Sequence, residues 1–192
     1  MHHSEQPARL AMPMLVLLPL LLLCYGVGNV HCSKVHDSSI DLQALLDFKQ
    51  GINDPNGALN NWTMRSHFCH WNGVQCTLEQ PRRVVGLKLP NQSLSGTISS
   101  SLGNLTFLNH LDLSYNNFVG PLPLLGKLTF LNYLDLSYNL FDGPLPPLGH
   151  LQQLQCLYLN NNNLSGIIPD ELGNCSNFDI LDLSSNLLVG SI

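Results

Sequence analysis

A histidine, an aspartate and a serine alternate in the run HLDLS, at His110, Asp112 and Ser114. These are the residue types of a hydrolytic triad, in which the histidine must reach the nucleophile at hydrogen-bond distance beside an oxyanion site. If the run is a strand, alternate side chains stand about 7 Å apart on one open face. We therefore expect no catalytic site, and we predict that the chain is not an enzyme and needs no cofactor.

The first part of the chain resembles a targeting segment. Residues 10–25 are almost wholly apolar, Arg9 precedes them, and small residues follow at 26–28. This apolar run is shorter than the roughly 20 residues of a membrane-spanning helix. The pattern predicts a secretory signal peptide over about residues 1–32, with an uncleaved anchor as the alternative. The mature protein is then expected in the secretory pathway and outside the cell.

Two cysteines lie close together in the run FCHWNGVQC, at Cys69 and Cys76, and His67 and His70 flank the first of them. Structural zinc sites usually space their cysteines as C-x(2–4)-C, whereas six residues separate this pair. In a secreted chain such a pair favours a local disulfide, with zinc as the alternative. We therefore predict a disulfide and no metal site.

Charge and glycosylation signals also bear on partners. Beyond Ser33 the chain has 12 acidic and 7 basic residues, and from Ser93 onward Lys127 alone faces seven acids. Such a surface repels phosphate, so nucleic-acid binding is not expected. We expect the dipeptide Arg82-Arg83 on a solvated edge. Five N-x-S/T sequons are candidate glycan sites: Asn61, Asn91, Asn104, Asn163 and Asn174.

From Leu87 onward a motif returns every 23 or 24 residues. Its copies read LKLPNQSLSGTI, LDLSYNNFVGPLP, LDLSYNLFDGPLP, LYLNNNNLSGIIP and LDLSSNLLVGSI. The core L-x-L-x-x-N-x-L at this period is typical of a leucine-rich-repeat solenoid, and Pro and Gly in each period argue against an amphipathic helix. We predict an α/β repeat fold in which about five repeats cover 84–192, the last one incomplete, and their short strands form a parallel concave sheet.

The repeat also assigns roles to its polar positions. An asparagine recurs three residues after the second strand leucine, where its amide can serve buried backbone groups of neighbouring turns. This predicted ladder comprises Asn116, Asn139, Asn162 and Asn186. Cys175 replaces a core leucine and is expected to be buried, whereas Cys156 is expected to face outward as a free thiol. Repeats two and three are one residue shorter after the proline, which should tighten their convex side.

A different unit precedes the repeats, over about 38–83. The spacing Ser38-x-x-Asp41 predicts a capping box that starts a helix, and the run DPNG at 54–57 turns the chain. The aromatic residues around Cys69 would cover the apolar end of the coil. We interpret the unit as an N-terminal cap.

The outward positions of successive strands form columns of residues that could bind a partner. We place His110, Tyr133, Cys156 and Ile180 in one column, and Asp112, Asp135, Tyr158 and Asp182 in the next. A third column holds Ser114, Ser137, Asn160 and Ser184. An aromatic and acidic patch suits a cationic or polar partner, although aspartate here could equally serve solubility alone. The ligand-binding candidates are His110, Asp112, Tyr133, Asp135, Tyr158 and Asp182.

These residues resemble the plant extracellular leucine-rich-repeat proteins, above all the receptor-like kinases and receptor-like proteins. The run LQALLDFKQGI with FCHWNGVQC is similar to their N-terminal cap, and GTISSSLGNLTFLNHLDLSYNNFVGPLP is similar to their repeat. The resemblance implies an ectodomain that binds a peptide, a small molecule, a protein ligand or a co-receptor ectodomain in signalling or defence. It implies contact with a membrane only through a missing C-terminal part.

The sequence departs from the complete pattern of that family. It contains no Gly-rich loop, H-R-D or D-F-G triplet, so no kinase activity can be assigned to it. It stops at Ile192 inside a repeat, from which we expect a truncated ectodomain whose open end promotes association. The alternative function is a secreted inhibitor or cell-wall interaction protein similar to the polygalacturonase inhibitors.

Overall fold

The computed structural model describes residues 30–190, which excludes most of the predicted signal peptide at 1–32. The chain divides into two compact units, residues 1–36 and 37–192. Helix α2, Val30–Gln50, begins in the first unit and ends in the second. Within the described part of the chain, no helix has the length and apolar character needed to cross a bilayer.

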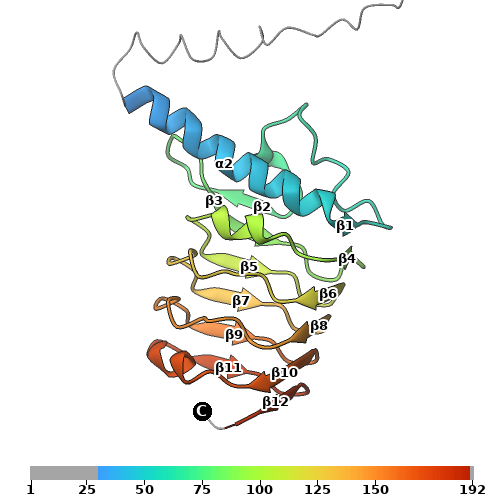
Figure 1. The fold of residues 1–192 in the computed structure, drawn as a ribbon. Coiled ribbons are helices and arrows are strands. Elements are labelled where there is room, and N and C mark those ends of the chain that lie inside the picture. The colour runs from blue at the N-terminus through green and yellow to red at the C-terminus, as the bar shows by residue number, and fades with distance from the viewer. Residues whose placement is uncertain (1–29, 191–192) are drawn as a thin grey trace, which may run out of the picture. The chain divides into compact units, whose positions relative to one another are not determined.

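The second unit is a coil of stacked turns whose short strands form two sheets (Figure 1). The concave sheet has the order β11-β9-β7-β5-β3-β2, and its strands are β2 Val74–Cys76, β3 Val84–Lys88, β5 His110–Asp112, β7 Tyr133–Asp135, β9 Cys156–Tyr158 and β11 Ile180–Asp182. From β3 onward neighbours are parallel and in repeat register, so that Leu111 pairs with Leu134 and Leu134 with Leu157. The predicted leucine-rich-repeat solenoid is confirmed.

A second sheet runs along the other side of the coil in the order β1-β4-β6-β8-β10-β12. Its strands are β1 Ile52–Asn53, β4 Ser95–Gly96, β6 Asn117–Pro121, β8 Leu140–Gly143, β10 Asn163–Ile167 and β12 Leu187–Val189. The described part of the unit also contains the 3-10 helices η2 Phe68–His70, η3 Ser100–Asn104 and η4 Asp170–Asn174. Helices η3 and η4 belong to the longer repeats one and four, whereas the shorter repeats two and three make turns there.

Leucines at the repeat positions fill the inside of the coil. The strand pair Leu111 and Leu113 is completely buried, as are Phe118 and Phe141, whose rings stack at 6.1 Å in successive turns. Cys175 is also buried at its leucine position, as predicted. Each turn therefore buries its apolar face against the next, as a stacked repeat must.

The asparagines at the predicted ladder positions bridge successive turns. Asn139 Nδ2 donates to Leu113 O of the preceding turn at 3.0 Å, and its Oδ1 accepts from Phe118 N at 3.0 Å. Asn116, Asn162 and Asn186 make the same pattern with their own neighbours. The amides thereby satisfy backbone groups that would otherwise be buried without partners.

Helix α2 packs on the first repeats through Ala44, Leu45 and Phe48, which are buried. The capping-box prediction is wrong, because the helix already begins at Val30 and Ser38 lies inside it. Asp41 is instead completely buried, where the apolar stripe of the helix should continue. It accepts from Arg83 Nε at 3.0 Å, from Arg83 Nη2 at 2.9 Å and from Val84 N at 2.8 Å.

Arg83 corrects a second expectation. We expected the dipeptide Arg82-Arg83 on a solvated edge, yet Arg83 is 6% exposed and paired with Asp41. Its guanidinium also lies 4.3 Å from the ring centroid of Phe107, a cation–π distance. The pair joins α2 to the first strand of the repeats, so the residue that looked like surface charge is part of the core.

The rest of the cap is held by a disulfide and by stacked indoles. Cys69 and Cys76 are bonded, which leaves no thiolates for zinc. No group of three His, Cys, Asp or Glu side chains within residues 30–190 is arranged to hold a metal ion. The rings of Trp62 and Trp71 stack with centroids 5.2 Å apart, and both are buried.

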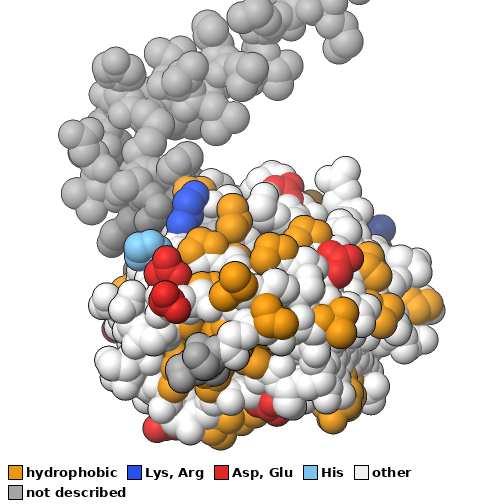
Figure 2. All heavy atoms as spheres, turned by 60° about the horizontal axis from the view of Figure 1, so that its bottom comes forward, with side chains coloured by type: hydrophobic (Ala, Val, Ile, Leu, Met, Phe, Trp, Pro, Cys, Tyr) orange, Lys and Arg blue, Asp and Glu red, His pale blue; other side chains and the backbone are white. Residues whose placement is uncertain are grey.

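The last turn presents an apolar face, where hydrophobic side chains gather (Figure 2). Leu181, Leu183 and Leu188 are only partly buried, although their equivalents in the inner turns are fully buried. Leu187 and Val189 beside them are exposed.

Candidate functional site

The outward side chains of the concave strands lie in columns, as the repeat pattern predicted. The strand register places His110 beside Tyr133, and Tyr133 beside Cys156. It places Asp135 beside Tyr158 in the next column, and the remaining members follow on β5 and β11. All six ligand-binding candidates are half-buried, which leaves part of each side chain open to a partner. They are His110, Asp112, Tyr133, Asp135, Tyr158 and Asp182.

The third column differs from our expectation. Ser114 and Ser137 are each 4% exposed, so they do not form an outward row. The reason is a local hydrogen bond, since Asp112 Oδ1 accepts from the Ser114 hydroxyl at 2.7 Å and from its N–H at 3.1 Å. Asp135 holds Ser137 in the same way, at 2.6 and 3.0 Å. Asp112 and Asp135 therefore hold the backbone where each strand ends. This is a structural role in addition to the solubility that the sequence suggested for them.

Aromatic rings cover the middle of the concave sheet. His110 and Tyr133 stack with centroids 4.1 Å apart and planes 5° from parallel. Tyr158 continues the row at 5.8 Å from Tyr133. The Tyr133 hydroxyl donates to Asp135 Oδ2 at 3.3 Å, which orients the ring. The site is a set of neighbouring rings held in place before any partner arrives.

Burial tunes the ionisable groups of this patch. Desolvation raises the pKa of the Asp135 carboxyl, and the neighbouring Asp112 adds to this, while the hydrogen bonds from Ser137 oppose it. Desolvation, with the Lys88 charge, lowers the pKa of His110. Desolvation and the nearby aspartates raise the pKa of Tyr133, so its hydroxyl stays a hydrogen-bond donor. The patch thus offers a half-buried carboxylate beside neutral rings.

Repeat four breaks the pattern at the same place. It has Cys156, Tyr158 and Asn160 where repeat three has Tyr133, Asp135 and Ser137. Asn160 is 8% exposed, and its Oδ1 has no hydrogen-bond donor among the described residues. In repeats two and three the residue at this position is a serine, whose hydroxyl donates to the strand aspartate, and repeat four lacks this arrangement.

A second aromatic pair lies at the strand exits. Tyr115 and Tyr138 stack at 4.2 Å, both are exposed, and both have φ near +55°. These tyrosines are not among the site candidates from the sequence, because the sequence does not show that their rings meet. The left-handed backbone at each exit, repeated in every turn, brings them together.

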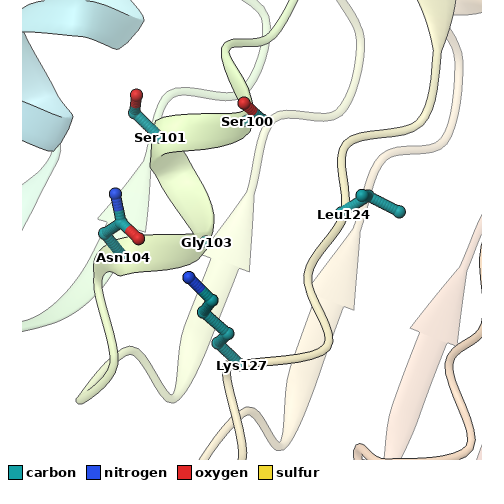
Figure 3. A pocket seen from close by; sticks show the side chains of 6 residues that line it. All are labelled: Ser100, Ser101, Gly103, Asn104, Leu124 and Lys127. Carbon is teal, nitrogen blue, oxygen red and sulfur yellow. The ribbon is translucent and has the colours of Figure 1, made fainter.

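Two shallow hollows lie away from the patch. One, of about 300 Å³, lies beside η3, and the Lys127 side chain points toward Gly103 and Asn104 there (Figure 3). The other, of about 310 Å³, lies beside the exposed and stacked rings of Phe107 and Phe130. Neither contains a candidate ligand-binding residue.

The sequons lie outside the strands of the concave sheet. Asn104 and Asn174 end helices η3 and η4, and Asn163 begins β10 in the other sheet. Asn91 is exposed after β3. Asn61 is exposed but its Nδ2 donates to His70 O at 3.2 Å. Glycans at these positions stay a prediction, and the four outside the cap would leave the patch open.

Comparison with known proteins places both parts of the chain. Residues 38–77 match the leucine rich repeat N-terminal domain, and residues 107–128, 130–151 and 153–175 match the leucine rich repeat. The LRR receptor-like serine/threonine-protein kinase GSO2 of Arabidopsis thaliana is 39% identical over 112 residues, which are 56% of this chain and 8% of that protein. The chain spans about a tenth of the length of the curated receptor kinases that it matches.

Solved ectodomains agree over most of both chains. The BIR2 ectodomain from Arabidopsis thaliana superposes with a TM-score of 0.74 at 35% identity, over 78% of this chain and 82% of that one. A chain of the BIR3–SERK2 complex from the same plant gives 0.73 at 34% identity, over 78% and 84%. On its cap, its repeats and these alignments, the chain belongs to the leucine-rich-repeat ectodomains of the plant receptor-like kinase and receptor-like protein family.

Proposed function

We propose that this chain is an extracellular recognition module that binds a polypeptide ligand or a co-receptor ectodomain on its concave sheet. The observation that carries the proposal is the prearranged row of His110, Tyr133 and Tyr158 beside half-buried Asp135. Rings and carboxylates that are already oriented lose little conformational entropy on binding, which favours affinity. Aromatic residues at the centre of a patch are also the usual anchors of protein interfaces.

The expected extracellular location and the similar structures support the same function. The cap disulfide fits an oxidising compartment. The predicted signal peptide at 1–32 would deliver the chain there, to the apoplast or the plasma membrane surface. A chain of the BIR3–SERK2 complex is among the similar structures, so an ectodomain of the SERK2 type is a suitable protein probe.

The test uses the full chain, secreted from plant cells, and two probes. One probe is a displayed library of random twelve-residue peptides, and the other is the purified SERK2 ectodomain. We expect at least one probe to bind, and we expect Tyr133→Ala with Asp135→Asn and Tyr158→Ala to abolish that binding. The matched control carries Val119→Ala, Leu140→Ala and Asp142→Asn, three exposed residues of the second sheet.

The readout is the dissociation constant from biolayer interferometry, with the unfolding midpoint of each variant measured alongside. Binding that survives the concave triple variant, or that the control abolishes equally, would contradict the proposed surface. Failure of both probes to bind the wild-type chain would contradict the proposed function itself.

A further inference from the structure

The fourth repeat replaces one member of an acidic column with an aromatic ring. Tyr158 pairs in register with Asp135 on one side and with Asp182 on the other. Neighbouring strands lie about 4.8 Å apart, so each carboxylate is one strand spacing from this tyrosine. The ring therefore stands between two carboxylates on the open face of the sheet.

Both carboxylates keep capacity for a further donor. Asp182 Oδ1 accepts from Ser184 N at 3.0 Å, and no hydrogen bond within the described residues occupies its Oδ2. Among the described residues, Asp135 Oδ2 accepts only from the Tyr133 hydroxyl, through a contact of 3.3 Å. A carboxylate oxygen can accept more than one hydrogen bond, so a cationic donor can join either group.

Asn160 gives an independent sign that this turn serves a ligand. It lies two residues beyond Tyr158 and is nine-tenths buried, and no donor in residues 30–190 reaches its Oδ1. In repeats two and three an aspartate and a serine occupy these positions, and the serine hydroxyl donates to the aspartate. Repeat four lacks this hydrogen bond at the turn that carries the Tyr158 ring. Such departures from the local pattern are expected at functional sites.

The negative charge of the repeats favours a cationic ligand. Seven acids and one base occur from Ser93 onward, and the base, Lys127, lies on the flank in the hollow beside η3. Desolvation already raises the pKa of Asp135, so this carboxylate gains more from a neighbouring cation than a solvated one would. Anionic ligands are disfavoured for the same reason.

We propose that Tyr158, flanked by Asp135 and Asp182, is a subsite for the guanidinium group of an arginine in an extended polypeptide ligand. A guanidinium stacks flat on an aromatic ring and donates through its edge to carboxylates, whereas an ammonium does neither as well. This inference rests on the proposed function, because it assigns one side chain of the ligand to one place on the concave sheet.

The experiment uses peptides selected against the wild-type chain from the same twelve-residue library. We expect arginine to be enriched at one position of the selected peptides. Replacing that arginine by citrulline, which keeps the shape and removes the charge, should weaken binding about tenfold or more. Lysine should give an intermediate affinity.

Protein variants locate the effect. Tyr158→Leu and Asp182→Asn should each abolish most of the difference between the arginine and citrulline peptides, whereas Tyr158→Phe, which keeps the ring, should retain it. Asp142→Asn, an exposed acid of β8, is the matched control and should leave the difference unchanged.

The outcomes separate the two proposals. Equal affinities of the arginine and citrulline peptides for the wild-type chain overturn the subsite, and so does a difference that persists in both Tyr158→Leu and Asp182→Asn. If those peptides still depend on the concave triple variant, the proposed function stands without the subsite. If the library yields no binder, the subsite falls, and the proposed function falls with it only if the SERK2 ectodomain also fails to bind.

Discussion

The asparagine ladder allows a stability loss to be worked out bond by bond. Asn139 is 6% exposed, and its side chain makes four hydrogen bonds to backbone groups. Replacement by leucine, which has a similar volume, removes all four bonds without opening a large cavity. The cost then depends on which backbone groups lose their last partner.

The three carbonyls served by Asn139 each keep a second donor. Leu113 O still accepts from Asn116 Nδ2, Leu136 O from Asn162 Nδ2, and Ser137 O from the Tyr115 N–H. The Phe118 N–H has Asn139 Oδ1 as its partner and loses it. A buried N–H without an acceptor costs about 2 kcal/mol, and the weakened carbonyls add about 1 kcal/mol. We therefore expect Asn139→Leu to lower the free energy of unfolding by about 3 kcal/mol.

The assay is urea denaturation of the full chain followed by circular dichroism. Asn117→Leu is the matched control, because Asn117 is exposed and makes no side-chain hydrogen bond within the described residues, so its replacement should change stability by at most about 0.5 kcal/mol. Should Asn139→Leu fail to fold, Asn186→Leu in the half-buried last turn gives a milder form of the same test. Equal losses for Asn139→Leu and Asn117→Leu would refute the ladder argument.

Two further predictions concern the cap and the concave patch. Asp41→Asn removes the carboxylate charge that is paired with the buried Arg83 guanidinium, and it should cost about 3–5 kcal/mol in urea denaturation. The exposed Glu79→Gln is the control and should cost a negligible amount; a loss as small as that control would show that the pair contributes little. Burial lowers the pKa of His110, so the unfolded chain binds more protons near pH 6.5 and stability should fall as pH drops through 6.5 toward 5. His110→Phe keeps the stack on Tyr133 but cannot be protonated, so its loss between pH 7.5 and 5 should be smaller than that of the wild type; identical pH profiles would exclude His110 as the cause.

The site could be predicted from the sequence as a set of positions but not as a set of contacts. Strand alternation and the repeat period place Tyr133, Asp135 and Tyr158 on one face, and the structure has them in adjacent columns. The period cannot show which side chains hydrogen-bond locally. The Asp135–Ser137 bond turns a residue expected to face outward into a buried one. Nor can the period show that Asn160 Oδ1, unlike the polar groups of Ser114 and Ser137 at the equivalent positions, has no hydrogen-bond partner among the described residues.

The sequence by itself determined the architecture of this protein, because an apolar pattern repeated every 23 or 24 residues buries its leucines only when the turns stack in register. The sequence also predicted the disulfide of the cap, because Cys69 and Cys76 are only seven positions apart and can therefore reach each other. The tertiary structure alone decided the burial of Asp41 and Arg83, which lie 42 residues apart in the chain. Local patterns suggested a capping box for Asp41 and a solvated edge for Arg83, and the desolvation of the two charges is offset only when the fold brings them together.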